Sequence, residues 1–578
     1  MIASQTVASR FYQPGVPAEI AVPSQSLVQL CERSVAEAGP YVATDFFGHT
    51  KTYTQLGEEI SRVAEGLRRL GVEAGDRVAI ILPNCPQHIV AFYAVMRLGA
   101  IAVEHNPLYT PRELRHMFED HAARVAICWD AAVRNLLTQP DDIQVRHIIA
   151  VNLLDEFPAA LRLALALPLP SLRRKRAQLT SRVAAPNKAG GPHLMKWRQL
   201  LDNDGLDPAT PKPSAQDVAV IQYTSGTTGV PKGAMLTHRN LYSNALQGEA
   251  WMHGAQYHEE VFYAVLPMFH AFGLTLFMTY GVLKQAHLVL FPSFDPAMVV
   301  AKAKKLPPTV YCAVPPIFEK TAELARAKKV SLQSAKYCIS GAMTLPQRTV
   351  ELWESCSGGL LVEGYGMTEA SPIALGNPFW STRRTGTIGL PFPSTQMKVV
   401  DPNNPSREVP QGERGELLIR GPQVFIGYWN DPHESEATLL DGGWLRTGDI
   451  VTQDADGFTT IIDRKKELII VGGFNVSPSE VEAVLRSHPD IHDAVAVGLP
   501  SPQTGEKVVA AVVPRAGAEI DATAVKAFCR QRLTPYKVPR EIHLFTDLPK
   551  SMLGKVLRSQ VRDQIIGEAC SSVPQPSS

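Results

Sequence analysis

Small hydroxyl residues, glycines and one lysine are concentrated in the stretch YTSGTTGVPKGAMLTH, Tyr223 to His238. Glycine lets a backbone pass close to a ligand, and hydroxyl and free N–H groups donate readily to phosphate oxygens. Lys232 would add a neutralising charge. The stretch differs from a Walker P-loop, because Lys232 is followed by Gly233 rather than by Ser or Thr. The pattern indicates a phosphate-binding loop of another kind, with a flexible surface linker as the alternative.

The bulk composition is that of an ordinary globular protein with more than one domain. Its 578 residues exceed what one compact core usually holds, and a formal net charge of +1 gives no general attraction to nucleic acid. Eight cysteines are scattered without a C-x-x-C pair, which argues against a zinc site or a disulfide framework. The N-terminus lacks a signal-peptide layout, and no apolar run approaches the roughly 20 residues that cross a bilayer. We expect a soluble cytoplasmic protein.

Alternating helix-like and strand-like segments predict an α/β fold with parallel sheets covered by helices. The stretch LGEEISRVAEGLRRLGV predicts a helix ending at Gly71, and DRVAIILP predicts a buried strand. The same alternation continues through AHLVLF, PAMVVAKAKK, TVYCAVPP and AKYCISG. Around the glycine-rich loop, VAVIQ predicts a strand and AMLTH the start of a helix.

A change of texture divides the chain into two domains. Short strands and turns follow Gly412 and predict a β-rich subdomain, and from about Glu467 a small α+β unit follows. We place the boundary in the charged segment 463–468. The expected organisation is a large N-terminal domain over 1–463, with an insertion at about 152–200, and a small C-terminal domain with a polar tail over 467–578.

An apolar stretch next to a basic run distinguishes residues 157–182, FPAALRLALALPLPSLRRKRAQLTSR. The run is Arg173, Arg174, Lys175 and Arg176. Such a segment could lie on an anionic membrane surface with its apolar face inserted. Alternatively, it is an insertion that packs on the protein while its basic run is merely solvated.

Further motifs follow the loop in a fixed order: LPMFHAFGL, SGAM, EGYGMTE, GELLIRGP, WLRTGDI, DRKKELIIVGGFNVSPSEVE and LPKSMLGKVLR. With them the chain, from about Tyr53 to Asp563, resembles the acyl-adenylate-forming superfamily and, within it, the bacterial long-chain fatty acid–CoA ligases. The resemblance implies that a fatty carboxylate attacks the α-phosphate of ATP, giving acyl-AMP and pyrophosphate. The thiol of CoA then displaces AMP. ATP and Mg²⁺ are the implied cofactors, and CoA is the implied co-substrate.

The resemblance also assigns roles around the triphosphate. Glu369 is the expected Mg²⁺ ligand, because a hard cation takes carboxylate oxygen, and Thr368 would contact the α-phosphate. Lys555, in a GK step, would stabilise the charge that develops during adenylation. The residues expected to hold the β- and γ-phosphates are Thr224, Ser225, Gly226, Thr227, Thr228, Gly229 and Lys232.

Other residues would bind the nucleoside or allow the small domain to rotate between the two half-reactions. Tyr365 would stack on adenine opposite Gly341 and Ala342, Asp449 would accept both ribose hydroxyls, and Arg464 would reach the nucleotide. The hinge is expected at 464–466, where Lys466 matches the hinge position. Gly473 would line the CoA channel, and His270 would shape the acyl and CoA approach. Each has an ordinary alternative: Glu369 as a helix-start carboxylate, Asp449 as a turn residue, Lys555 as an exposed lysine, His270 as a buried histidine.

Two competing functions share much of this pattern. An acyl-AMP ligase that passes the acyl group to a carrier protein has the same ATP motifs, although DRKKELIIVGGFNV is more similar to the CoA ligases. A non-catalytic fatty-acid binding or trafficking protein is disfavoured by the intact Lys232, Glu369, Asp449 and Lys555.

Candidate walls of the acyl pocket are Phe269, Phe272, Gly273 and Val314. Fatty acid, ATP and CoA are the expected partners, with a homodimer and peripheral contact at the inner face of the membrane as further expectations.

Overall fold

The computed structural model describes residues 8–139, 142–181, 183, 191–224, 231–471, 474–501, 504–551 and 554–571. The chain folds into two compact units: unit 1, Met1–Met397 and Ile419–Leu445, and unit 2, Lys398–Leu418 and Arg446–Ser578. Parallel sheets, a large N-terminal part and a small C-terminal part confirm the predicted α/β class.

The first sheet of unit 1 has the strand order β7-β6-β5-β3-β4-β8-β9 among the described residues. Its strands run parallel except for the antiparallel pair β8–β9. They are β3 (Arg77–Ile81), β4 (Ile101–Glu104), β5 (Val125–Trp129), β6 (His147–Val151), β7 (His193–Lys196), β8 (Val218–Thr224) and β9 (Lys232–Thr237). The helices of this part are α2 (Leu27–Ala38), α3 (Tyr53–Arg69), α4 (Pro86–Arg97), α5 (Pro111–His121), α6 (Val133–Leu137) and α9 (Trp197–Leu200).

Sequence signals explain where these elements begin and end. Helix α3 begins after Thr52, whose hydroxyl accepts from the Gln55 N–H while the Gln55 side chain accepts from Thr52 N. The structure confirms the helix predicted in LGEEISRVAEGLRRLGV, as α3, and the strand predicted in DRVAIILP, as β3. The predicted helix start at AMLTH is wrong for Ala234 to Thr237, which continue strand β9; α10 (His238–Trp251) begins only after the capping residue Thr237.

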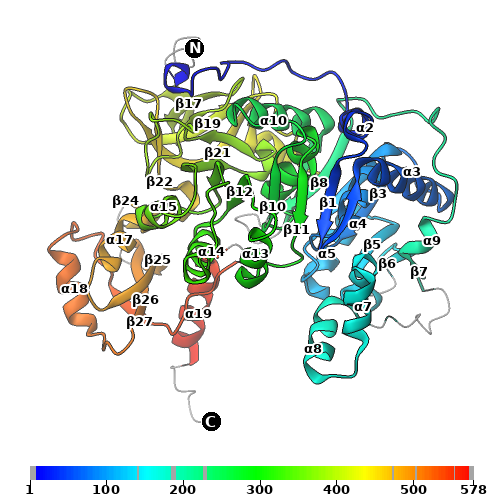
Figure 1. The fold of residues 1–578 in the computed structure, drawn as a ribbon. Coiled ribbons are helices and arrows are strands. Elements are labelled where there is room, and N and C mark those ends of the chain that lie inside the picture. Colours follow the sequence, from blue (N-terminus) through cyan, green and yellow to red (C-terminus); the bar gives the residue numbers. More distant parts are fainter. Residues whose placement is uncertain are drawn as a thin grey trace. The chain divides into compact units, whose positions relative to one another are not determined.

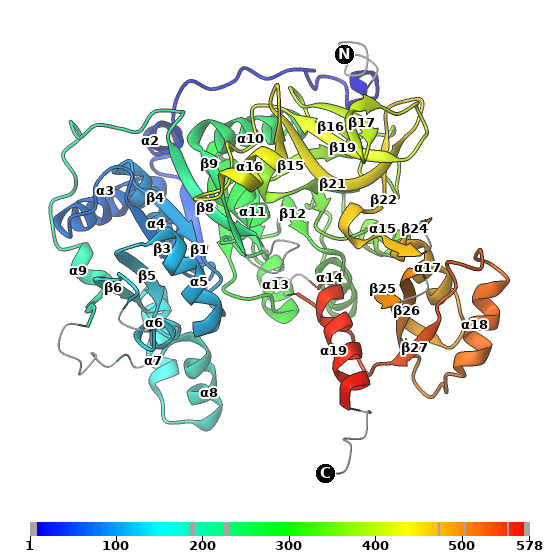
Figure 2. The ribbon, with the colours of Figure 1, turned by 180° about the vertical axis from the view of Figure 1, so that it is seen from behind.

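The second sheet of unit 1 has the order β16-β15-β14-β13-β12-β10-β11-β1-β2 within the same described part of the chain. The pairs from β1 through β11, β10, β12, β13 and β14 are parallel. The strands are β1 (Val42–Phe46), β2 (His49–Thr52), β10 (Val261–Ala264), β11 (His287–Leu290), β12 (Val310–Ala313), β13 (Tyr337–Ser340), β14 (Leu361–Gly366), β15 (Ile373–Gly376) and β16 (Leu390–Pro391). Helices α13 (Pro296–Ala303), α14 (Pro315–Lys328) and α15 (Gln347–Glu354) lie beside this sheet (Figures 1 and 2).

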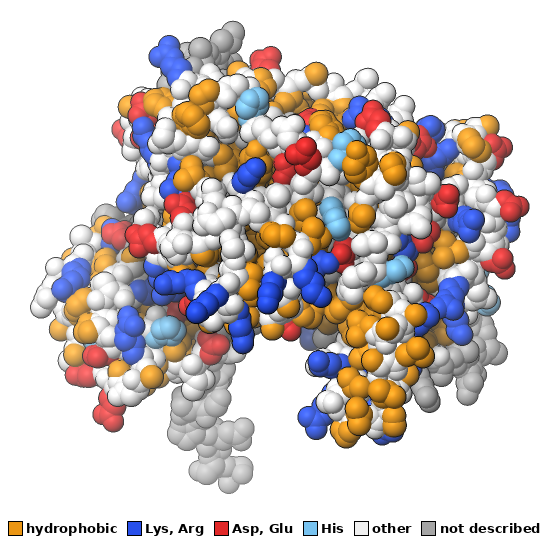
Figure 3. Space-filling model, in the orientation of Figure 1, with side chains coloured by type: hydrophobic (Ala, Val, Ile, Leu, Met, Phe, Trp, Pro, Cys, Tyr) orange, Lys and Arg blue, Asp and Glu red, His pale blue; other side chains and the backbone are white. Residues whose placement is uncertain are grey.

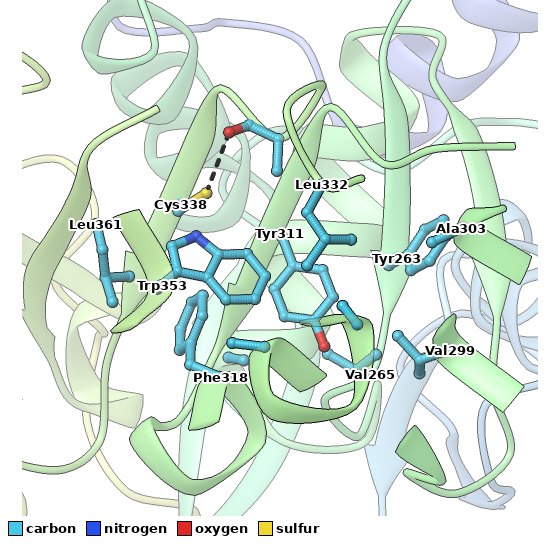
Figure 4. Packing of buried hydrophobic residues seen from close by; sticks show 14 of the residues in the cluster. Tyr263, Val265, Val299, Ala303, Tyr311, Phe318, Leu332, Cys338, Trp353 and Leu361 are labelled. Carbon is cyan, nitrogen blue, oxygen red and sulfur yellow. Dashed lines mark hydrogen bonds between the residues drawn. The ribbon is translucent and has the colours of Figure 1, made fainter. Parts of the chain in front are cut away.

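An aromatic cluster fills the space between this sheet and its helices (Figure 4). The Trp353 indole stacks on the ring of Tyr311 with 4.8 Å between centroids, and meets Phe318 edge to face at 4.7 Å. All three side chains are fully buried. This packing fixes β12 and β13 against α14 and α15, and so positions the carboxyl ends of the strands, where ligands bind in open α/β sheets.

Mostly short strands precede the compact α+β part of unit 2, as predicted, but the predicted start after Gly412 is too late, because β17 and β18 come before it. They are β17 (Gln396–Asp401), β18 (Asn404–Glu408), β19 (Gly415–Arg420), β20 (Leu439–Leu440), β21 (Trp444–Gln453) and β22 (Thr459–Arg464). The α+β part has the sheet order β24-β23-β26-β25, with β27 beside β26. Its elements are β23 (Ile469–Val471), β24 (Phe474–Val476), α17 (Pro478–Arg486), β25 (Ile491–Ser501), β26 (Gly505–Pro514), α18 (Ala522–Arg530), β27 (Glu541–Leu544) and α19 (Arg558–Ser571).

The apolar and basic segment 157–182 forms two short helices, α7 (Ala159–Ala166) and α8 (Pro170–Leu179), which pack against each other. Leu165 is the one buried residue of α7, and α8 buries none of its described residues. No helix in the described ranges is long and apolar enough to cross a membrane.

Candidate active site

The residues that bracket the glycine-rich loop lie opposite each other on neighbouring strands of unit 1. Thr224 ends β8, Lys232 begins β9, and the two are partners in the antiparallel register. The hydroxyl of Thr224 donates to the carbonyl of Lys232 at 3.5 Å. The loop residues expected to bind phosphate lie outside the described residues: Ser225, Gly226, Thr227, Thr228 and Gly229.

Lys232 and Glu369 are brought together around the ring of Tyr428. The Nζ atom of Lys232 lies 2.6 Å from Glu434 Oε1, on helix α16 (Pro432–Thr438), and 5.8 Å from the centroid of the Tyr428 ring. The hydroxyl of Tyr428 donates to Glu369 Oε1 at 2.7 Å. Burial, followed by the charge of Glu369, raises the pKa of Tyr428 well above its usual range, so the phenol stays a donor.

Glu369 lies in the short helix η4 (Thr368–Ala370) and is 6% exposed. Thr368, beside it, is half-buried. No cluster of three or more His, Cys, Asp or Glu side chains that could hold a metal occurs in the described part of the chain. A single carboxylate nevertheless suits Mg²⁺, which is usually bound by one or two carboxylates together with waters and substrate phosphates.

The residues expected around adenine lie at the carboxyl ends of two adjacent parallel strands. Gly341 directly follows β13, and Tyr365 lies in β14, two residues after Glu363, which pairs with Ser340. A Cβ atom at Gly341 would lie 2.9 Å from the ring of Phe272, so a side chain there would displace that ring. Ala342 has a positive φ of 63°, which turns the chain sharply after Gly341.

Glu363 is a buried carboxyl group that sequence reasoning did not single out. Burial raises its pKa to about 8, and its Oε2 atom has no hydrogen-bond partner among the described residues. The carboxyl is therefore protonated at neutral pH. Nothing in EGYGMTE distinguishes this glutamate from Glu369: both are buried, and they differ in that Glu369 accepts from the Tyr428 hydroxyl.

His270 caps the short helix α11 (Ala271–Gly273), and its Nδ1 accepts from the Phe272 N–H at 3.3 Å. Loss of hydration lowers the pKa of His270 to about 4. The imidazole is therefore neutral at physiological pH. Because Nδ1 is an acceptor, the ring proton lies on Nε2.

A small apolar cavity lies next to these strand ends in unit 1. It is bounded by α10, by the π-helix η3 (Leu274–Tyr280), and by strands β13 and β15. A π-helix in this position fits the tendency of such segments to occur at functional sites. The predicted pocket residues Phe269, Phe272, Gly273 and Val314 are not among the lining residues, which are Asn244, Gly248, Trp251, Met252, Thr275, Leu276, Tyr280, Ile339, Ile373 and Phe392.

Three further predicted residues form a charged group within unit 2. Asp449 in β21 is 3% exposed and pairs in register with Arg464, the last residue of β22, whose Nε lies 3.1 Å from Asp449 Oδ1. Crowding by surrounding atoms, followed by the positive charge of Arg464, lowers the pKa of Lys555, although this side chain keeps contact with solvent. Glu467 and Asp449 oppose that shift. The fold thus places Asp449, Arg464 and Lys555 in one electrostatic neighbourhood.

The expected hinge lies where β22 passes into the short helix η5 (Lys465–Glu467), which contains Lys466. Just before it, Asp463 accepts from the Ser477 hydroxyl at 2.5 Å and from Ser479 N at 3.1 Å, so the start of α17 is tied to the end of β22. Gly473 lies outside the described residues.

Family models match both parts of the chain. The model described as AMP-binding enzyme matches residues 31–429, and the model described as AMP-binding enzyme C-terminal domain matches residues 480–555. The first alone covers more than half of the sequence. The chain therefore belongs to the AMP-binding enzyme family.

Individual relatives match over almost the full length. A long-chain-fatty-acid–CoA ligase of Bacillus subtilis is 35% identical over 554 residues, covering 96% of this chain and 97% of the relative. One from Escherichia coli is 37% identical over 566 residues, covering 96% and 98%. Among solved structures, ATP-bound MatB from Rhodopseudomonas palustris is 27% identical with a TM-score of 0.76, covering 93% of this chain and 98% of that one.

Proposed function

We propose that this protein is an AMP-forming long-chain fatty acid–CoA ligase. The observation that carries the proposal is the full-length similarity to ligases of that name, at 35–37% identity. In the first step a carboxylate oxygen attacks the α-phosphorus of ATP, and the bond to the β-phosphate breaks with release of pyrophosphate. In the second step the sulfur of CoA attacks the acyl carbon, the C–O bond to AMP breaks, and the thiol proton is lost to solvent.

The chain's own residues would manage the charge in the first step. Lys232, already paired with a carboxylate, would exchange Glu434 for phosphate oxygens, together with Thr224 and the loop 225–229. Glu369 would hold Mg²⁺, with Tyr428 fixing its orientation; the bound cation would neutralise phosphate charge. Thr368, next to Glu369, would contact the α-phosphate. Such positioned charges supply most of the catalysis in phosphoryl-type transfers.

The remaining predicted residues would bind the nucleoside and stabilise the charge that develops during adenylation. Gly341, Ala342 and Tyr365 would flank adenine at the carboxyl ends of β13 and β14. In unit 2, Asp449 would bind the ribose hydroxyls, Arg464 would orient Asp449 and reach the nucleotide, and Lys555 would supply positive charge for adenylation.

Domain movement is proposed to separate the two steps. We assign the N-terminal domain to 1–463, the hinge to 464–466 around Lys466, and the C-terminal domain to 467–578. Gly473 would line the path of CoA, where a side chain would obstruct the pantetheine arm. His270, neutral at physiological pH, would shape the acyl and CoA approach rather than transfer a proton.

An acyl-AMP ligase with another acceptor is the main competing function. Purified protein incubated with ATP, Mg²⁺, CoA and fatty acids from C6 to C20 separates the two when products are identified by mass. We expect acyl-CoA and AMP, with the highest yield for long chains. Acyl-AMP without acyl-CoA would favour the competing function, and binding of fatty acid without either product would favour a non-catalytic trafficking protein.

Location and assembly are proposed on the same basis. ATP and CoA are cytoplasmic substrates, so we propose a cytoplasmic protein that makes peripheral contact with the membrane through residues 157–182, where its apolar substrate partitions. A homodimer is proposed as the assembly state, and light scattering on the purified chain tests it.

A further inference from the structure

The helix pair α7–α8 exposes an unusual amount of apolar surface. Leu163, Leu167 and Leu169 are 71%, 51% and 52% exposed. The run Leu163 to Pro170, LALALPLP, contains no charged residue. Figure 3 shows apolar side chains gathered over this pair, with lysine and arginine side chains at its edges. Three large exposed leucines within seven residues form an apolar patch of the kind that marks an interaction surface.

The pair is firmly attached at its base, although most of its residues are exposed. On the α7 side, Phe157 packs against Phe46 and Phe47, with ring centroids 5.5 and 4.3 Å apart. On the α8 side, the Trp129 indole N–H donates to Leu179 O at 2.9 Å, and Asp130 accepts from Ser181 N at 3.0 Å. A segment clamped at both ends while its leucines face solvent fits a surface that is presented to a partner, and not a loosely packed insertion.

Positive charge adjoins the apolar patch on α8. Arg173, Arg174, Lys175 and Arg176 are all exposed on α8. A second exposed basic group lies at the adjoining C-terminal ends of α13 and α14, which pack against each other: Lys304, Lys305, Arg326, Lys328 and Lys329. Figures 1 and 2 both draw α13, α14 and the α7–α8 pair toward the same side of unit 1. Basic side chains at helix C-termini are common because they complement the dipole, but that explanation does not cover the run within α8.

We propose that the α7–α8 pair is a membrane-docking element whose partner is an anionic lipid bilayer. Leu163, Leu167 and Leu169 enter the boundary between headgroups and acyl chains, and the basic residues of α8 contact the headgroups. The ends of α13 and α14 add a second contact with the same surface. An apolar tip beside clustered cations has the chemistry of an interfacial anchor, whereas a protein partner or a second copy would need acidic groups placed to match the basic run.

This inference deepens the proposed function, since the fatty acid substrate of such a ligase partitions into the same bilayer. Docking on one side of unit 1 would keep the enzyme close to its apolar substrate. The chemistry itself does not depend on docking, because α7 and α8 contribute none of the proposed active-site residues.

Sedimentation of the full-length chain with two kinds of vesicle tests the proposal. One kind is phosphatidylcholine alone, and the other contains about one third phosphatidylglycerol. We expect binding to the anionic vesicles that weakens as salt is raised. Each basic residue near an anionic surface changes binding by roughly fivefold, so R173S/R174S should lose at least about tenfold. The variant K304S/K328S should lose a smaller factor.

Matched controls separate the surface from general effects of charge and hydrophobicity. R348S/R530S removes two exposed positive charges elsewhere, and Leu544→Ser removes a leucine that is 60% exposed in unit 2. We expect both to bind like the wild type, while L163S/L167S/L169S loses binding to both vesicle kinds. Retained acyl-CoA formation with fatty acid in solution would show that each variant is folded, and keeps failure of docking distinct from failure of the proposed function.

Several results would overturn the proposal. Binding that is equal on both vesicle kinds and insensitive to salt would contradict the role of the basic residues. Unchanged binding in the triple leucine variant would contradict the role of the apolar tip. A dimer that becomes a monomer in the same leucine variant, without any vesicle binding by the wild type, would assign the patch to a second copy of this chain.

Discussion

Replacing Glu363 with Gln tests whether a buried carboxyl on β14 is held neutral by the fold. The folded state raises its pKa to about 8 from an ordinary 4.5. Between these values the folded chain holds a proton that the unfolded chain has released. The folded state therefore binds more protons, and the free energy of unfolding falls as pH rises through this window. The neutral amide of Gln has nearly the same shape and removes this dependence.

The size of this stability change follows from the slope of the free energy of unfolding against pH. One proton of difference is worth about 1.36 kcal/mol per pH unit, so wild-type unit 1 should lose about 2.7 kcal/mol between pH 5.5 and pH 7.5 through Glu363 alone. In a unit of this size that corresponds to a Tm decrease of about 3 °C. The Gln variant should lack this part of the decrease, because it carries no proton to release.

Tryptophan fluorescence is a selective assay, because all seven tryptophans of the sequence lie in unit 1. The Tm of wild type and variant is measured from pH 5.5 to 7.5, and the difference between the two chains is plotted against pH. Other titrating groups cancel in that difference. Parallel curves for the two chains would refute the reasoning, since they would show that Glu363 ionises in the folded state as it does in the unfolded chain.

Three further outcomes are expected. Tyr428→Phe removes the donor to buried Glu369 and should cost about 1–3 kcal/mol of stability and raise the KM for MgATP; an unchanged KM would contradict the role of Tyr428 in orienting that carboxylate. Lys555→Ala should lower acyl-AMP formation by about 10²–10³ while thioester formation from supplied acyl-AMP is largely kept, and equal loss of both half-reactions would contradict the proposed division. The cavity beside Tyr280 is only about 10 Å³, so Gly248→Leu should overpack it and cost about 1–3 kcal/mol of stability, whereas Gly248→Ala, whose Cβ would lie 3.6 Å from that ring, should melt like the wild type; equal Tm values for the two variants would contradict this packing.

Hydrophobic periodicity and turn signals were sufficient to predict the α/β architecture, because the hydrophobic faces of helices and strands determine which segments must pack together. The capping pair Thr52–Gln55 and the helix stop at Gly71 mark α3 in the sequence itself. The segment AMLTH was misassigned because its residues suit either element. The register that pairs β9 with β8 is a tertiary contact, and it outweighs local propensity.

The candidate site likewise contains some residues that sequence motifs reveal and others that only the fold reveals. Lys232, Glu369 and Asp449 could be singled out from the sequence because their motifs occur in a fixed order, and their roles stay predictions. Tyr428 and Glu434 could not be singled out, because they lie about 200 residues from Lys232 in sequence and their role depends on contacts that only the fold creates. The walls proposed for the acyl pocket, from side chains close to His270, stay a prediction; the small cavity lined from α10, η3, β13 and β15 could not be predicted, because only folding brings those elements together.

These unpredicted partners explain how the phosphate-binding half can be organised before the nucleotide binds. Lys232 is only 13% exposed, and a cation in that position without a partner would pay a large desolvation cost. Glu434 provides the opposite charge, and Tyr428 holds Glu369 through a donor that stays protonated. Triphosphate binding would then exchange one carboxylate for several phosphate oxygens at a lysine already in place. Because the side chains are ordered beforehand, less of the binding energy is spent on positioning them, and more remains for the charge that develops at the α-phosphate.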